Sequence, residues 1–177
     1  MKIANPHHVE YNYRKAKPGD LQDLVTIYNY AVGTFESTCD VSEVSIESRR
    51  TWLRDHINNP ARPLWVAYVV GDPTKICGYL CFSDFLNARE GYKITSDLAI
   101  YLHPNYQSQG LGSFLLSSAL KVAPTLGIHV LATTIFSSNK KSLSLFKKFD
   151  FQVWGELPGV ANLNGKIKDL TVVGIHL

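Results

Sequence analysis

The stretch from residue 93 to residue 123 joins a long strand pattern to an amphipathic helix pattern through a loop with two glycines. In the strand, Leu98 and Ile100 fall on one side, and Asp97 and Tyr101 fall on the other. A strand this apolar needs cover on both faces, so the unit predicts an α/β fold around a central sheet. The loop also predicts an anion site, because a helix N-terminus exposes unpaired backbone N–H groups at the positive end of its dipole.

The rest of the chain alternates in the same way, and no repeat, low-complexity segment or linker divides it. Further strands are expected over residues 11–16, 64–70, 76–84, 129–136, 151–156 and 168–176, and helices over residues 21–31, 45–59, 109–123 and 139–149. Asp20 is expected to cap the first helix, and residues 71–73 are expected to form a turn. This order predicts one α/β domain over residues 11–177, preceded by a flexible N-terminus over residues 1–10.

The amino-acid composition argues against several classes of protein. Hydrophobic residues make up 45% of the 177 residues and charged residues 19%, and no apolar run approaches the roughly 18 residues that span a bilayer. The first residues lack the apolar centre of a signal peptide, so a cytoplasmic protein without a membrane partner is expected. The net charge of +3 comes from scattered side chains, which argues against nucleic acid. Cys39, Cys77 and Cys81 lack the spacing of a zinc or redox motif, so no metal is expected.

Three nucleotide-binding interpretations of the glycine loop compete, and two of them fail. A P-loop needs a lysine after its last glycine, but Gly112 is followed by Ser113. A dinucleotide fold needs a third small residue where Leu115 stands, and an acid about 20 residues further on that is missing here. The pattern that remains is Gln-x-x-Gly-x-Gly over residues 107–112. A plain strand-to-helix turn, in which the glycines only permit a tight bend, stays open as the alternative.

This pattern after a strand resembles the acyl-CoA loop of the GCN5-related N-acetyltransferases, the GNAT family. The resemblance covers residues 13–173 and looks closest to the branch of phosphinothricin, methionine sulfoximine and other amino-acid acetyltransferases. The segments that carry it are Ile27-Tyr28-Asn29-Tyr30-Ala31-Val32, Glu47-Ser48-Arg49-Arg50-Thr51-Trp52, Tyr101-Leu102-His103-Pro104 and Leu126-Gly127-Ile128-His129-Val130-Leu131.

The resemblance implies a fold and an activity. The fold is a single GNAT domain of the α/β class, in which a mixed, mostly antiparallel central sheet has helices on both faces. The activity is direct transfer of an acetyl group from acetyl-CoA, without a metal, to the amino group of a small molecule of amino-acid type. The resemblance also implies a homodimer.

The cofactor would be held by three segments, again by resemblance. The backbone of Ile100, Tyr101 and Leu102 would hold the pantetheine arm and supply oxyanion donors. The loop would bind the diphosphate through Gln107, Ser108, Gln109, Gly110, Leu111, Gly112 and Ser113. Asn139 would contact the CoA arm, and a role as a helix N-cap is compatible with that contact.

Asp97 stands where the phosphinothricin-type enzymes carry a glutamate, so the resemblance makes it the general base. An alkylammonium must lose a proton before it attacks, and a carboxylate can take that proton, often through a water. A structural or water-holding role for this acid is the alternative. Many relatives place a proton donor for the leaving thiolate at the position of Phe146, which cannot donate. Here Tyr101 or a water would serve, or the thiolate would leave unassisted.

The acceptor would be held by the segment before the central strand. Arg89, Glu90, Gly91 and Tyr92 lie where the resembling enzymes contact their substrate, and Arg89 has a planar fork suited to a carboxylate. A solvated loop arginine is the alternative. Two further segments are expected to shape the same pocket: Phe35, Glu36 and Thr38 between the first two helices, and residues 162–166 between the last two strands. Two other functions stay open: an acyl-CoA-binding module with weak or no catalysis, and a protein or peptide N-acetyltransferase.

Overall fold

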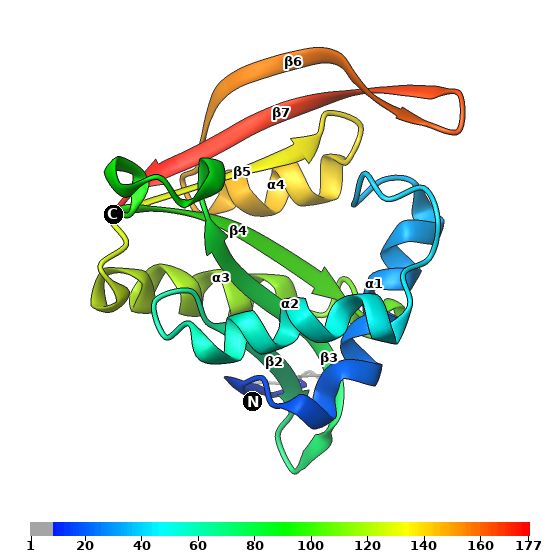
Figure 1. The fold of residues 1–177 in the computed structure, drawn as a ribbon, viewed down its shortest axis with the longest axis vertical. Helices are drawn as coiled ribbons and strands as arrows, with labels where there is room; N and C mark the ends of the chain where they lie inside the picture. The colour runs from blue at the N-terminus through cyan, green and yellow to red at the C-terminus, as the bar shows by residue number, and fades with distance from the viewer. Residues whose placement is uncertain (1–8) are drawn as a thin grey trace, which may run out of the picture.

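The computed structural model describes residues 9–177, which form a seven-stranded sheet in the order β1-β2-β3-β4-β5-β7-β6 (Figure 1). The strands are β1 (Tyr11–Lys15), β2 (Leu64–Val69), β3 (Asp72–Asp84), β4 (Thr95–Leu102), β5 (Val130–Phe136), β6 (Gln152–Leu163) and β7 (Lys166–His176). The longer helices are α1 (Leu21–Thr34), α2 (Ile46–Asn58), α3 (Leu111–Val122) and α4 (Lys140–Lys148). Among residues 9–177, only β4 and β5 pair in parallel, which confirms the mixed, mostly antiparallel sheet. Most of the N-terminus expected over residues 1–10 lies outside the described residues.

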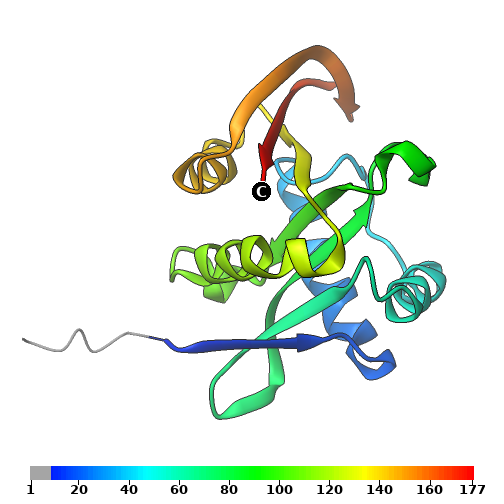
Figure 2. The ribbon, with the colours of Figure 1, turned by 90° about the vertical axis from the view of Figure 1, so that its left-hand side faces the viewer.

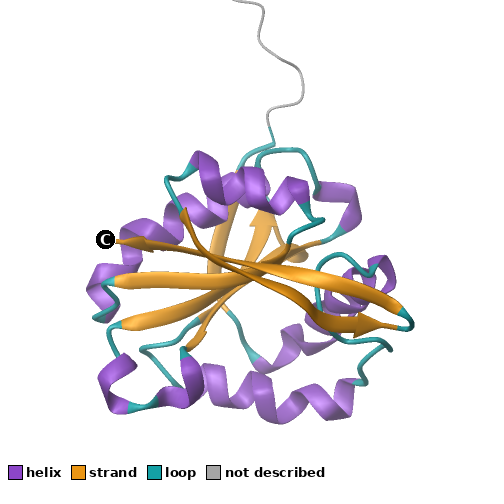
Figure 3. Cartoon of the chain, turned by 90° about the horizontal axis from the view of Figure 1, so that it is seen from above, coloured by secondary structure: helices purple, strands orange, loops and turns teal. Residues whose placement is uncertain are grey.

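Helices cover both faces of the sheet, as expected (Figures 2 and 3). The core under α3 and α4 contains Leu98, with Ile100 and Leu102 packed against it. The core under α1 and α2 has Ala99 and Tyr101 packed against it instead. The predicted alternation of β4 is therefore confirmed, and its side chains divide between the two cores. No helix among residues 9–177 is long and apolar enough to cross a membrane.

Asp20 precedes α1 as expected, but its carboxylate does not cap that helix. It accepts two hydrogen bonds from the Arg14 guanidinium, at 2.7 and 2.8 Å, and one from the Lys17 N–H at 2.8 Å. A two-pronged, charge-assisted pair is stronger than a neutral cap bond. The predicted cap is therefore wrong, and the carboxylate ties the end of β1 to the short turn before α1.

The last two strands are longer than the pattern predicted. The sequence predicts a strand over residues 151–156, but β6 continues through Pro158 and Gly159 with a register shift between Leu157 and Ala161. The hairpin turns at Asn164 and Gly165, whose φ angles of 52° and 89° suit a tight two-residue turn. The β6–β7 hairpin extends beyond the end of β5 (Figure 1).

A buried arginine joins the strands that lead into the centre of the sheet. Arg62 is 5% exposed, and its Nε lies 3.0 Å from a carboxylate oxygen of Asp84 at the end of β3. Its Nη2 donates to the carbonyls of Lys93 and Thr95, at 2.9 and 3.2 Å, where β4 begins. The sequence patterns gave no sign of this contact, because its partners lie 22 to 33 positions away.

Replacing the guanidinium should therefore destabilise the fold. Arg62→Met keeps the apolar stem but leaves the buried Thr95 carbonyl and the part-buried Lys93 carbonyl without this donor, so we expect a loss of about 3 kcal/mol in the free energy of unfolding. Arg54→Met is the control, since that side chain is 67% exposed, and its effect should stay within about 0.5 kcal/mol. Urea unfolding measures both, and equal midpoints for the two variants would contradict the role given to Arg62.

Candidate active site

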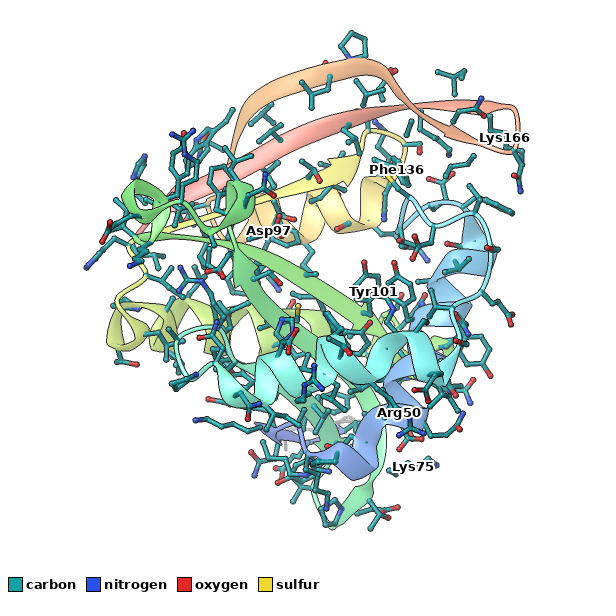
Figure 4. All side chains as sticks on the ribbon, viewed as in Figure 1. Arg50, Lys75, Asp97, Tyr101, Phe136 and Lys166 are labelled. Atoms are coloured by element: carbon teal, nitrogen blue, oxygen red, sulfur yellow. The ribbon has the colours of Figure 1, made fainter. Side chains whose placement is uncertain are left out.

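Strands β4 and β5 pair for only three residues and then diverge. Thr95–Asp97 pairs with Val130–Ala132, after which β5 keeps only β7 as a neighbour. The divergence leaves a groove of about 1160 Å³ between the two strands. Its walls come from β4, β5, the α1–α2 connection, the loop before α3, and α4. Figure 4 labels Asp97 and Tyr101 along β4 and Phe136 at the end of β5.

The open edge of β4 presents backbone groups to this groove. The His103 N–H donates to the Cys77 carbonyl on β3 at 2.9 Å. Successive amides along a strand point in opposite directions, so the Tyr101 N–H also faces β3, whereas those of Ile100 and Leu102 face the groove. Of the three backbone donors expected from the sequence, two are therefore available to a ligand.

The glycine loop forms one end of the groove. Gly110 has a φ of 87° and occupies the N-cap of α3, a conformation that favours glycine. Five of the seven predicted loop residues line the groove, namely Gln107, Ser108, Gly110, Gly112 and Ser113. The two others do not: Gln109 donates through its side chain to the Asn105 carbonyl, and the Leu111 side chain is fully buried. The N-terminus of α3 thus opens on the groove, as an anion site requires.

Gly112 has a packing reason as well. A Cβ built at this position would lie 3.0 Å from a methyl group of Leu145 on α4. The glycine therefore lets α3 approach α4 closely, in addition to lining the groove. Lys140 and Lys141, at the start of α4, line the same groove and add positive charge to it.

Asp97 lies at the point where the two strands separate, and its side chain lines the groove. Among residues 9–177, no lysine, arginine or histidine forms an ion pair with it. Burial raises the pKa of this carboxyl, while the Thr133 hydroxyl and the Leu98 N–H oppose the shift. A carboxylate with a raised pKa and without a cationic partner is a stronger base than an ordinary aspartate.

Tyr101 and Phe146 also line the groove, from opposite sides. Burial, and then the neighbouring Tyr28, raises the pKa of the Tyr101 hydroxyl, so it stays protonated. Phe146 is 4% exposed, and its ring meets Phe151 edge to face at 4.9 Å. This side chain is part of the core under α4, which explains an apolar residue there.

Asn139 caps α4 and forms a hydrogen bond to the α1–α2 connection. Its side-chain oxygen accepts from the Ser142 N–H at 3.1 Å, and its amide nitrogen donates to the Glu36 carbonyl at 2.9 Å. The Glu36 carboxylate pairs with Lys168 of β7 at 2.5 Å and accepts from the Ser138 hydroxyl at 2.6 Å. These contacts tie three distant segments together at the groove. No local sequence pattern indicates this ion pair, since its partners are 132 positions apart.

The predicted substrate residues do not gather at the groove. Arg89, Glu90, Gly91 and Tyr92 are exposed, lie in or beside short turns before β4, and are not among the residues that line it. Phe35 follows α1 in the left-handed conformation, with the Lys166 ammonium 5.7 Å from its ring centre. Within residues 9–177, no group of three or more His, Cys, Asp or Glu residues could hold a metal ion.

A smaller cavity, of about 170 Å³, lies beside the groove, between α1, α2 and the sheet face formed by β3 and β4. It shares Ala99 and Tyr101 with the groove, and Arg49 of α2 is its one charged lining residue. Arg49 lies three positions before Trp52, on the same face of the helix expected over residues 45–59, and no role was predicted for it. A cation among apolar positions on one helix face was the signal available.

Comparison with known proteins adds independent information. Residues 24–151 match the model of the "Acetyltransferase (GNAT) family". YwnH of Bacillus subtilis is 37% identical over 93% of this chain and 98% of its own. The L-methionine sulfoximine/L-methionine sulfone acetyltransferase of Pseudomonas aeruginosa is 28% identical over 93% of each chain. The structure of yncA from Salmonella typhimurium, with its cofactor acetyl-CoA, has a TM-score of 0.85 and 29% identity over 94% of each chain.

Proposed function

Because the chain belongs to the acetyltransferase (GNAT) family, we propose that it transfers the acetyl group of acetyl-CoA to the amino group of a small, amino-acid-like molecule. The observation that carries this proposal is the groove between β4 and β5, which joins free strand amides to a glycine loop at a helix N-terminus. The Pseudomonas relative acetylates methionine sulfoximine and methionine sulfone, which supports an acceptor of the same kind, such as phosphinothricin.

In this proposal acetyl-CoA lies along the groove. The diphosphate would meet the amides at the start of α3, with Lys140 and Lys141 close to the same ligand. The pantetheine arm would follow the open edge of β4, and the Ile100 or Leu102 N–H would donate to the oxyanion as the acetyl carbonyl is attacked. Fixed donors of this kind are worth several kcal/mol in acyl transfer, roughly 3 kcal/mol for one donor.

Asp97 would act as the general base. The ammonium group of the acceptor loses two protons during amide formation: one ends on the sulfur of CoA and the other leaves to solvent. Before the attack, Asp97 would take one proton from the ammonium group, directly or through a water, so that the neutral amine can attack the thioester. Thiolate is a fair leaving group, with a pKa of about 8.5 for a free thiol. It can leave without an acid at Phe146, and the Tyr101 hydroxyl is the donor nearest to that role on β4.

The acceptor would enter from the side of the α1–α2 connection, where Glu36 and Thr38 line the groove. Arg89–Tyr92 and Phe35 remain proposed substrate contacts. In one protomer Arg89–Tyr92 lie outside the groove lining, so we propose that they act on the acceptor through a second subunit. Solvent-exposed positions on a loop are compatible with that arrangement.

We further propose a homodimer. The β6–β7 hairpin carries five exposed apolar side chains, Val153, Trp154, Leu157, Val160 and Ile167, at the edge of the sheet. A cluster of this kind on an edge strand is typical of an interface or of an aggregation site. We expect twice the chain mass of 19.8 kDa by light scattering, and a monomer after Val160→Glu with Ile167→Glu. A wild-type mass of one chain would contradict the dimer.

The proposed reaction uses acetyl-CoA, and we place it in the cytoplasm, with no membrane or nucleic-acid partner. The small net charge of +3 supports the absence of a nucleic-acid partner. Fractionation of cells that express the full chain measures its location, and recovery with membranes would contradict the placement.

A negative charge added at the glycine loop should weaken acetyl-CoA binding without destabilising the fold. Ser113→Glu places a carboxylate in the first turn of α3, where it favours the helix but repels a diphosphate in the groove. We expect at least a tenfold loss of acetyl-CoA affinity by calorimetry, with unchanged or higher thermal stability. Ser117→Glu, one turn later and not among the groove residues, is the matched control. Equal affinities for the two variants would refute the loop assignment.

Asp97→Asn should remove the base and keep the cofactor site. We expect kcat/KM at neutral pH to fall about 100-fold or more, and the deficit to shrink as pH rises toward the pKa of the acceptor amine. The raised pKa of Asp97 means that its ionised form destabilises the folded chain at neutral pH, so the variant should be as stable as the wild type or more stable. A pH-independent deficit with lower stability would instead indicate a structural acid.

A further inference from the structure

The small cavity beside β4 is lined by aromatic rings, an arginine and a few apolar side chains. Its lining residues are Leu24, Val25, Tyr28, Arg49, Trp52, Tyr79, Cys81, Ala99 and Tyr101. Its volume of about 170 Å³ compares with roughly 150 Å³ for an engineered cavity that holds one benzene. It therefore suits a group of about six or seven non-hydrogen atoms, such as an amino-acid side chain.

Arg49 packs against aromatic rings of the cavity wall, but only part of its hydrogen-bonding capacity is used. Its guanidinium lies 4.4 Å from the ring centre of Tyr28 and 5.7 Å from that of Trp52. One nitrogen donates to the Asp40 carboxylate at 3.1 Å. Within residues 9–177 its other nitrogens have no hydrogen-bond partner, so they remain available for an oxygen of a ligand.

Tyr79 supplies an independent observation. The residue is 2% exposed, and its hydroxyl makes no hydrogen bond within residues 9–177, although the hydroxyl oxygen itself keeps a small accessible area. The contrast is Tyr28, whose hydroxyl lies 2.6 Å from that of Thr38 and donates to Asp40 at 2.7 Å. A buried hydroxyl is costly unless it is paired. Since Tyr79 lines the cavity, an acceptor oxygen placed there would satisfy it.

The position of the cavity relates it to the proposed chemistry. Ala99 lines both spaces, and Asp97 is the next residue of β4 on the same face. Two residues of a strand span about 7 Å, which is close to the length of an amino-acid side chain. An acceptor with its amine at Asp97 could therefore place the end of its side chain beside Arg49.

We propose that this cavity binds the side chain of the acceptor amino acid and favours side chains that end in a hydrogen-bond-accepting oxygen, which Arg49 and the Tyr79 hydroxyl contact. The proposal rests on the acetyltransferase function above and adds its substrate selectivity. A cationic side chain is disfavoured by Arg49, and a purely apolar one leaves the Tyr79 hydroxyl unpaired. Both residues are specificity-determining and take no part in the proton transfer.

Tyr79→Phe is the sharpest test, because it removes one oxygen and keeps the ring. With L-methionine sulfone as acceptor we expect kcat/KM to fall about tenfold, the loss of one hydrogen bond, mainly through a higher KM. With L-norleucine, an apolar acceptor of similar length, the change should stay within about threefold. Arg49→Met should reduce the preference for the sulfone further. Arg50→Met is the matched control: that neighbour is 61% exposed, is labelled in Figure 4, and is not part of the cavity.

Direct measurement of acceptor binding tests this proposal independently of the proposed acetyl transfer. Calorimetry of L-methionine sulfone against the full chain loaded with CoA should show about tenfold weaker binding for Tyr79→Phe, with unchanged affinity for CoA. Equal sulfone binding by wild type and Tyr79→Phe would overturn the selectivity role, as would no sulfone binding by the wild type at millimolar concentration. Selective sulfone binding without any acetyl transfer would support the cavity assignment and overturn the acetyltransferase function alone.

Discussion

The short parallel contact between β4 and β5 determines the rest of this architecture. Two neighbouring strands in the middle of a sheet normally satisfy each other's backbone groups, because a buried N–H or C=O without a partner is costly. Here the contact ends after Asp97, although both strands continue. The amides beyond that point need another partner, and an extended chain with carbonyl groups of its own can supply one. The groove is thus a region in which β4 and β5 lack both backbone hydrogen bonds to each other and close packing.

The elements around this gap contribute different physical properties to the site. The loop and the starts of α3 and α4 contribute positive electrostatic character, while β4 contributes directed donors and one carboxylate with a raised pKa. The face under α1 and α2 contributes aromatic walls and a single guanidinium. The proposed roles in cofactor charge, proton transfer and substrate selectivity therefore fall on separate segments, and a change in one need not disturb the others.

The sequence predicted the elements and the alternation of β4 well, because both follow from local periodicity. It also placed the glycine loop correctly before a helix. It could not predict where β4 and β5 separate, since both strands have ordinary patterns throughout. The ion pair between Glu36 and Lys168 was not predictable for the same reason, because this contact depends on tertiary folding. The substrate role of Arg89 came from resemblance alone, and the structure leaves that residue outside the groove, whereas Arg49 was visible as a cation on a mainly apolar helix face.

The contact between Gly112 and Leu145 links the loop to α4. A Cβ at position 112 would lie 3.0 Å from a methyl group of Leu145, so a side chain there requires Leu145 to shift. The two positions are therefore expected to vary together in evolution, with a larger residue at one tolerated only beside a smaller residue at the other. Such a pair would register as covariation between two helices that form the same groove, although neither residue need touch the reacting atoms.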